Sequence, residues 1–208
     1  GTLASAHVLW ELDGADSTRP LQFHTRSGLL VANRDERGFI ELDFPEEPAT
    51  ELAADHADRA ALLPAFGLEA SDVLWVGRNR MDVIAEVTPA AFARLRPQSD
   101  AICQIETRVI SITAAGNPLP MPEGVPAAGE YDFSSRAFGP LVGIEEDPVC
   151  GSAHCCLGPY WSAKLGKREM LARAASPRGG DVAVRLEGQR VILGGQAVVT
   201  LAGELTHS

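Results

Sequence analysis

The sequence lacks the features that mark several classes of protein. No apolar run is long enough to cross a membrane, and no signal-peptide pattern is present. Basic residues are in the minority, since 18 lysines and arginines against 28 acidic residues give a formal net charge of −10. Nucleic acids and anionic membranes bind positively charged surfaces, so we expect neither as the main partner.

The sequence also lacks the cysteine spacing of a metal site or a disulfide framework. Its four cysteines, Cys103, Cys150, Cys155 and Cys156, contain no C-x-x-C pair and no second cluster. Disulfide frameworks belong to oxidising compartments, whereas this pattern is ordinary for a reducing one. We therefore expect a cytoplasmic protein without bound metal.

Glycine and proline, in contrast, are abundant. The 20 glycines and 14 prolines among 208 residues predict many turns and many short strands. The length suits one large domain or two small ones, each with its own core.

One stretch organises the chain, residues 143–161, with the sequence GIEEDPVCGSAHCCLGPYW. Its acidic turn ends at Pro148, and Ser152 is a natural N-cap for a helix that starts one residue later. Residues 153–165 are apolar on almost every side, so this helix has to be buried against a sheet. The free N–H groups at its N-terminus suit a carboxylate or a phosphate.

The flanking segments predict short strands separated by helices. We expect helices at 2–12, capped by Thr2, at 55–66 and at 89–95, a linker at 45–50 and a loop at 115–129. Strands are expected at 21–25, 29–33, 39–44, 73–76, 81–87, 109–113, 131–138, 169–174, 181–186, 190–193 and 197–201. Short strands joined by turns favour antiparallel or mixed pairing, which predicts an α+β fold.

Residues 146–154 carry the most specific resemblance in the sequence. Together with the N-terminal GTLASAHVLWEL and the closing GGQAVVTLAGEL, they resemble the phenazine-biosynthesis PhzF-like family, which is related in fold to diaminopimelate epimerase and proline racemase. The resemblance implies an α+β, diaminopimelate epimerase-like fold. This fold has two pseudo-symmetric domains, each a rolled mixed or antiparallel sheet around a central helix, with the active site between them.

The resemblance also implies where the domains lie. Residues 1–48 match the remainder of the N-terminal domain, 49–195 the C-terminal domain, and 196–208 a closing strand that returns to the N-terminal domain. In the family, a Cys-Gly-His-type motif precedes the Gly1-Thr2 pair, and a glutamate further upstream acts as the general base. Neither is present in this sequence, so we expect a piece of a longer protein that is inactive by itself.

Four residues of the central stretch match the family's signature. Asp147 matches its active-site aspartate, and Gly151 and Ser152 match a pair whose backbone and hydroxyl hold the substrate carboxylate. His154 lies in the same signature and is a secondary catalytic candidate. Each has a structural alternative: a carboxylate that stabilises the helix dipole, an N-cap, and a hydrogen-bonded core histidine.

Cys150 and Arg136 are further candidates with two interpretations each. The family usually has threonine in place of Cys150, whereas the related cysteine racemases and epimerases place a catalytic cysteine there. A helix N-terminus lowers a thiol pKa and favours thiolate chemistry, but a small residue packed in a tight turn also explains Cys150. Arg136 is able to bind a substrate carboxylate bidentately, or to pair with Glu145 or Glu146.

The sequence thus predicts a PhzF-like isomerase that transfers a proton on a small carboxylate substrate by acid–base catalysis. We expect it to need no cofactor and to form a homodimer. Two alternatives stay open. One is a cysteine-dependent racemase or epimerase that uses Cys150, and the other is a non-catalytic binding or dimerisation module.

Overall fold

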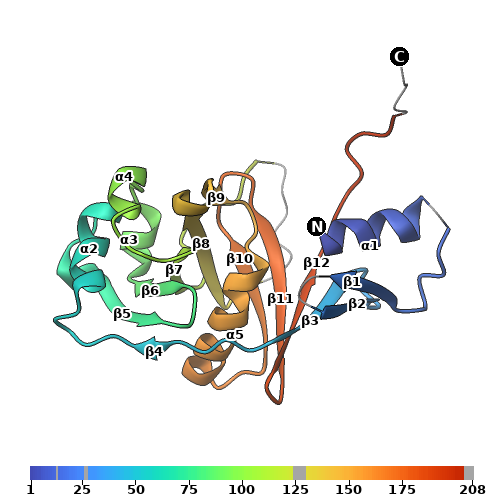
Figure 1. Ribbon diagram of the computed structural model, residues 1–208, viewed down its shortest axis with the longest axis horizontal. Helices are drawn as coiled ribbons and strands as arrows, with labels where there is room; N and C mark the ends of the chain where they lie inside the picture. The colour runs from blue at the N-terminus through green and yellow to red at the C-terminus, as the bar shows by residue number, and fades with distance from the viewer. Residues whose placement is uncertain (13, 26–27, 124–129, 204–208) are drawn as a thin grey trace.

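The computed structural model describes residues 1–12, 14–25, 28–123 and 130–203 (Figure 1). The N-terminal part contains α1 (Thr2–Glu11), β1 (Leu21–Thr25), β2 (Gly28–Arg34), β3 (Ile40–Pro45) and β4 (Thr50–Glu51). The middle contains α2 (Ala57–Phe66), β5 (Val73–Arg78), β6 (Val83–Val87), α3 (Pro89–Ala93), α4 (Ser99–Ile102), β7 (Ile110–Ala115), β8 (Phe133–Gly139) and β9 (Ile144–Asp147). The last elements are α5 (Gly151–Leu165), β10 (Glu169–Ala174), β11 (Gly180–Glu187) and β12 (Arg190–Gly195).

The strands form one mixed sheet in the order β1-β2-β3-β12-β11-β10-β8-β7-β6-β5-β4, with β9 paired to β8. Neighbouring strands are antiparallel except for the pairs β8–β10 and β6–β7, which are parallel. The N-terminal strands continue into the rest of the sheet because β3 pairs with β12 along its whole length. Figure 1 shows α1 and β1–β3 at one end, α2–α4 at the other and α5 between them. The predicted α+β fold with a largely antiparallel sheet is confirmed.

Helix α5 is buried, as its apolar sequence predicts. Cys156, Leu157 and Trp161 are almost inaccessible to solvent and pack against strands β10, β11 and β12. Gly158 allows the closest approach, because a Cβ at this position would lie 3.1 Å from a methyl group of Val184. The Trp161 indole Nε1–H, the helix's deepest polar group, donates to a threonine hydroxyl of β7 at 3.0 Å.

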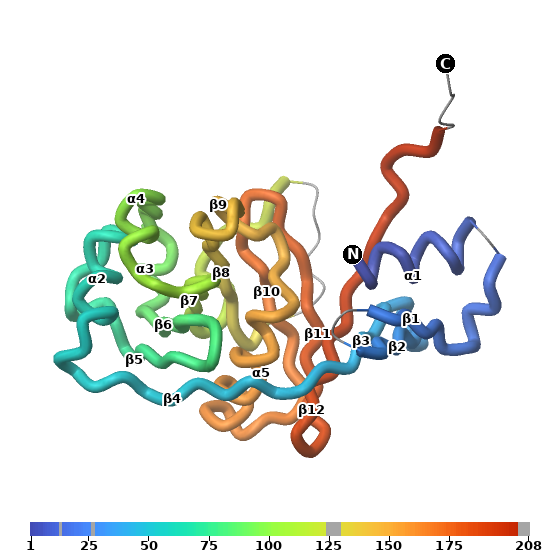
Figure 2. The backbone as a smooth tube through the Cα atoms, viewed as in Figure 1, coloured from blue at the N-terminus to red at the C-terminus, as the bar shows by residue number. Residues whose placement is uncertain are grey.

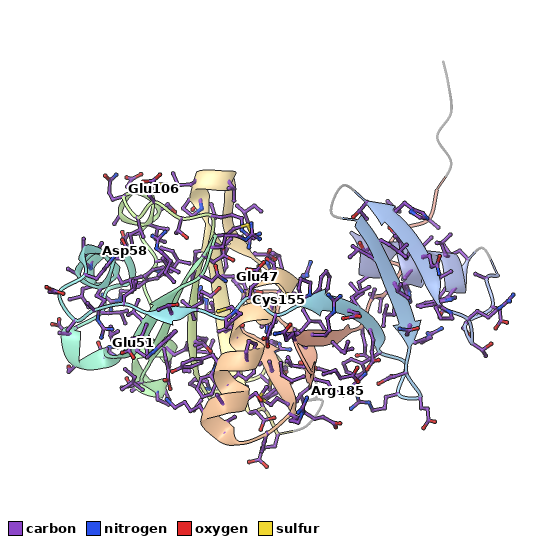
Figure 3. All side chains as sticks on the ribbon, turned by 60° about the horizontal axis from the view of Figure 1, so that its bottom comes forward. Glu47, Glu51, Asp58, Glu106, Cys155 and Arg185 are labelled. Carbon is purple, nitrogen blue, oxygen red and sulfur yellow. The ribbon has the colours of Figure 1, made fainter. Side chains whose placement is uncertain are left out.

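The chain between β3 and β4 runs along α5, as the tube in Figure 2 shows. This segment contacts α5 at the carbonyl of Cys155. Pro159 has no N–H and therefore leaves that carbonyl without a donor inside the helix. The backbone N–H of Glu47 donates to that carbonyl at 2.9 Å, and Figure 3 labels the two residues side by side. The predicted linker is therefore an extended segment that is fixed to the central helix.

Strand β6 separates two hydrophobic cores. Its residues Val83, Ala85 and Val87 belong to the core built with α2 and α3. Ile84, on the opposite face, belongs to the core around α5, as expected for a strand that is buried on both sides. Glu86 also lies on the α5 face, where the Tyr160 hydroxyl donates to its buried carboxylate and Lys164 forms an ion pair with it.

The strand predicted at 197–201 is wrong. β12 ends at Gly195, and residues 196–203 form neither helix nor strand. Val198 is 79% and Leu201 88% exposed, and Figure 1 shows this segment leaving the sheet near the start of α1. β-branched residues form a strand only where a neighbouring strand supplies hydrogen-bond partners, and no described strand does so here. Residues 204–208 of the predicted closing strand lie outside the described residues.

The other predicted helices and strands match the observed ones to within two residues at each end. Two details differ. Thr2 does not cap α1, because the helix begins there and Gly1 occupies the capping position without a side-chain hydrogen bond. The predicted loop at 115–129 starts one residue later, since Ala115 ends β7, and its residues 124–129 lie outside the described residues.

Candidate active site

The N-terminus of α5 is positioned by the strand pair β8–β9. Asp147, the last residue of β9, lies opposite Ala137 in β8. After Pro148 the chain turns, and Cys150, in an extended conformation, is the N-cap of a helix that starts at Gly151. Ser152 is therefore the second residue of the helix, and the prediction that it caps the helix is wrong. The helix starts two residues earlier than predicted because the extended Cys150, not Ser152, forms its boundary.

The first turn of α5 has an open side. Apart from its chain neighbours and the helix backbone, no described atom lies within 4 Å of the place that a Cβ on Gly151 would occupy. The exposed Ser152 hydroxyl Oγ accepts a hydrogen bond from Nη2 of Arg108 at 3.1 Å and lies 3.5 Å from the Cys150 sulfur. The first N–H groups of a helix have no partner inside it, and they attract anions. This end of α5 therefore offers both amide and hydroxyl donors to an anion.

Arg108 is a site residue that the sequence analysis missed. Its Nε and Nη2 bind the two carboxylate oxygens of Asp82 at 2.9 and 2.5 Å, and this contact is the main cause of the raised pKa of Arg108. Asp82 is buried, with 3% of its side chain exposed, and its backbone N–H is held by the side chain of Asn79 at 2.7 Å. The parallel register of β6 and β7 joins the two residues, which are 26 positions apart. No local signal in the sequence reveals that register.

Asp147 lies half-buried beside the helix start. Its Oδ1 accepts the N–H of Val149 at 3.1 Å. Its carboxylate also acts on Cys150, through its charge and a side-chain hydrogen bond. Among the described residues, Asp147 forms no ion pair with a basic side chain. Its carboxylate therefore remains available for proton transfer.

The pKa of the Cys150 thiol is raised, whereas the sequence predicted that the helix N-terminus would lower it. Burial is the largest influence and raises the pKa of the thiol. Hydrogen bonds from Ser152 and from the backbone of Ala153 oppose this shift, while the charge of Asp147 adds to it. With 6% of the residue exposed, the desolvation of a thiolate outweighs the helix dipole. The expectation of a lowered pKa is wrong.

His154 is 1% exposed and lies in the first turns of α5, with its ring against Phe133. Its Nδ1 is 2.8 Å from the backbone carbonyl of Cys150. Because a carbonyl only accepts hydrogen bonds, Nδ1 carries the hydrogen, and Nε2 is left without a partner among the described residues. Burial lowers the pKa of His154, so the ring is neutral near pH 7. This geometry matches the hydrogen-bonded core histidine that was the structural alternative.

Arg136 forms a closed pair with Glu146. Its Nε and Nη2 bind the two carboxylate oxygens at 2.7 and 2.8 Å, and both side chains are largely buried. Glu145, the other possible partner, accepts instead from the hydroxyl of Ser99. The bidentate fork that was expected for a substrate carboxylate is thus occupied by a protein carboxylate.

With this geometry established, comparison with known proteins identifies the family. Residues 1–203 match the family model PhzC-PhzF, described as "Phenazine biosynthesis-like protein". The chain belongs to the PhzF family. It is 45% identical to an uncharacterized isomerase of Halalkalibacterium halodurans over 207 residues, which are 98% of this chain and 71% of that protein. An uncharacterized isomerase of Pseudomonas aeruginosa is 38% identical and is covered to 72% of its length.

Solved structures of PhzF-family proteins share the fold. A phenazine biosynthesis protein of the PhzF family from Enterococcus faecalis is 29% identical with a TM-score of 0.80, over 99% of this chain and 72% of that one. The putative PhzC/PhzF protein from Clostridium difficile is 30% identical, again with a TM-score of 0.80 and the same coverage. The diaminopimelate epimerase-like fold class predicted from the resemblance is thereby confirmed.

In this PhzF-family chain, the predicted residues fall into two groups. Asp147, Cys150, Gly151 and Ser152 meet at the start of α5, while Arg136 and His154 lie nearby with their polar groups engaged or buried. No group of three or more His, Cys, Asp or Glu side chains suited to a metal ion occurs within the described ranges. In the same ranges, none of the helices is long and apolar enough to cross a membrane.

Proposed function

We propose that this chain belongs to an isomerase that transfers a proton between positions of a small carboxylate substrate by acid–base catalysis, without a cofactor. The observation that carries the proposal is the meeting of an unpaired carboxylate with an open helix N-terminus in a member of the PhzF family. Relatives from two bacteria that bear the name isomerase support the reaction class.

The substrate carboxylate would bind at the first turn of α5. Gly151 leaves room for it, and Ser152 supplies a hydroxyl on the exposed side. The partial positive charge of a helix N-terminus typically contributes about 0.3–1 kcal/mol to binding a negative group. Each charge-assisted hydrogen bond adds about 1.5–3 kcal/mol. These two effects together suffice to hold a small anion.

Asp147 would give a proton to the substrate, or take one from it. It lies at the helix start, and among the described residues its partners are a backbone N–H and the Cys150 thiol, so no described cation blocks its proton exchange. By family resemblance, the base that removes the first proton is a glutamate that would precede Gly1. We therefore expect the 208-residue chain to be inactive by itself.

The thiol-based alternative has weaker support. A racemase cysteine acts as a base in its thiolate form, whereas burial raises the pKa of Cys150 and keeps the thiol protonated near pH 7. Because Cys150 is buried, a Cys150→Ala variant of a catalytically complete protein separates the two mechanisms better than a thiol alkylator does. Unchanged turnover in that variant would eliminate a cysteine base.

Solvent exchange tests the proposal. The chain is compared with a version extended before Gly1 by the N-terminal region of the Halalkalibacterium halodurans isomerase. Both are incubated in deuterated water with 2-amino, 2-hydroxy and unsaturated carboxylic acids, and loss of C–H signals is followed by proton NMR. We expect exchange with at least one acid in the extended protein only, and a rate roughly 10²–10⁴-fold lower in its Asp147→Asn variant.

Two results would overturn the proposal. Equal exchange by the unextended chain would show that the assigned base is wrong. No exchange with any acid in the extended protein would favour a non-catalytic binding module. Homodimer formation and a cytoplasmic location stay predictions.

A further inference from the structure

We propose that Arg108 selects anionic substrates at the first turn of α5, by binding the substrate carboxylate and by orienting the Ser152 hydroxyl toward it. This inference deepens the proposed function and rests on it. No pattern in the sequence indicates such a role for Arg108, which comes from the segment before β7, far from the central stretch.

The guanidinium is held in one orientation from its buried side. Asp82 accepts from Nε and Nη2 of Arg108 at 2.9 and 2.5 Å, and Asp82 is itself fixed by Asn79. The backbone N–H of Arg108 also donates to the carbonyl of Met81 at 3.0 Å. A planar guanidinium fixed along one edge presents its remaining N–H groups in a defined direction. Arg108 is thus pre-organised without any ligand.

Arg108 reaches the first turn of α5 and has donors that no described residue uses. Nη2 reaches the Ser152 hydroxyl at 3.1 Å, and a third of the Arg108 side chain is exposed. No hydrogen bond of Nη1 to a described residue is found. Nη1 therefore keeps its N–H groups for an anion at this turn, where Gly151 leaves open space among the described residues.

The bond to Ser152 sets the direction of the hydroxyl proton. A serine hydroxyl has one hydrogen to donate and two lone pairs to accept. Because Arg108 occupies a lone pair of Ser152, the hydroxyl hydrogen points away from the guanidinium. A bound carboxylate would then take the hydroxyl hydrogen from the Cys150 sulfur, which lies 3.5 Å from the Ser152 Oγ and is a weak acceptor. It would also receive hydrogen bonds from the guanidinium and from the helix N–H groups. A neutral amide of the same shape would lose most of this attraction.

A purely structural role is the competing explanation. An Arg–Asp pair with a buried carboxylate stabilises the fold whether or not a ligand binds, and removing only the arginine would leave Asp82 unpaired. The test variant is therefore Asp82→Asn/Arg108→Gln, which removes both charges together and keeps the net charge. Arg190→Gln is the control, because Arg190 also binds an aspartate, Asp43, through Nε at 2.7 Å, but from strand β12 and with no hydrogen bond to a described residue of α5.

The experiment is an NMR titration of the ¹⁵N-labelled 208-residue chain with benzoate and with benzamide at constant ionic strength. In the wild-type chain we expect benzoate, and not benzamide, to shift the amide signals of Gly151, Ser152 and Ala153. The double variant should bind benzoate roughly 10-fold or more weakly, as expected when charge-assisted hydrogen bonds are lost. Arg108→Lys keeps the positive charge but not the bidentate guanidinium, so it should prefer benzoate over benzamide more than the double variant does and less than the wild type does. Arg190→Gln should bind benzoate like the wild type.

The outcomes separate this inference from the proposed function. If the double variant binds benzoate as tightly as the wild type, Arg108 does not select anions, while the carboxylate site at α5 stands. If the wild-type chain shows no benzoate-dependent shift at these three amides, the proposed carboxylate site itself fails, and the role of Arg108 fails with it. Thermal unfolding of each variant confirms that the compared chains are folded.

Discussion

Replacing His154 by glutamine should remove a loss of stability that the wild-type chain shows in mild acid. His154 is buried in α5, and its Nε2 has no described partner to share an added proton. Burial is the largest cause of the lowered pKa, while the Cys150 carbonyl and the charge of Asp147 oppose the shift without cancelling it. Glutamine retains an N–H that is able to donate to the Cys150 carbonyl, but it does not titrate.

The sign and size of the effect follow from proton linkage. An unfolded histidine has a pKa near ~6.5, so as the pH falls below that value the unfolded chain binds a proton that the folded chain does not. The stability that depends on neutral His154 is therefore complete above about pH 6.5 and is lost as the pH falls toward the lowered folded pKa. Between about pH 6.5 and 5.5 one such group costs at most about 1 kcal/mol, which corresponds to roughly 2–4 °C in melting temperature for a chain of this size.

The assay is thermal or urea unfolding at closely spaced pH values across that window. The difference in unfolding free energy between the wild type and His154→Gln should shrink by up to about 1 kcal/mol from the upper to the lower end of the window, because only the wild type loses stability through this group. His24→Gln, on an exposed position of β1, is the control and should follow the wild type. Parallel curves for the wild type and His154→Gln would refute the assignment of a buried, neutral imidazole.

Three further predictions concern the surroundings of α5. Tyr160→Phe removes a hydrogen bond to the buried Glu86 carboxylate and should cost about 1.5–3 kcal/mol in urea unfolding, whereas a loss below about 0.5 kcal/mol would contradict this contact. Gly158→Val adds methyl groups where a Cβ would already lie 3.1 Å from a valine of β11, so it should lower the free energy of unfolding by about 1–3 kcal/mol. Gly151→Ala places its methyl group in open space and is the control; its free energy of unfolding should stay within about 0.5 kcal/mol of the wild type. In the native chain only Cys103, the one cysteine that is not buried, should react rapidly with a disulfide reagent, since burial raises the pKa of the other three thiols. Rapid reaction of a second thiol would show that the start of α5 opens.

The elements that the sequence predicted well are those with a local cause. Helix α5 follows from an apolar segment without a polar face, and its C-terminal end from Gly166 in the left-handed conformation. The start of α3 follows from Thr88, whose side chain accepts the N–H of Ala91 as an N-cap, with Pro89 in the first turn. These signals lie within a few residues of the structure that they produce.

The elements that were missed or wrong depend on partners far away in the chain. The segment 197–201 has the β-branched residues typical of a strand, but a strand needs a neighbour, and the described residues supply none. The sequence left open whether Arg136 binds a substrate or Glu146. The antiparallel pairing of β8 with β9 decides for Glu146. The contact of Arg108 with Asp82 likewise depends on a parallel register that no local pattern records.

The charges around the start of α5 explain why the candidate chemistry falls on Asp147. Two carboxylates near the start of α5 are neutralised by arginine forks: Glu146 by Arg136 and Asp82 by Arg108. Asp147 differs, because within the described part of the chain it receives only a backbone N–H and the neighbouring thiol. A carboxylate clamped by a guanidinium holds its charge but exchanges protons poorly, since protonation would break the pair. The fold thus uses its bidentate pairs to fix the geometry, and Asp147, beside the N-terminus of α5, is the carboxylate that we propose for proton transfer.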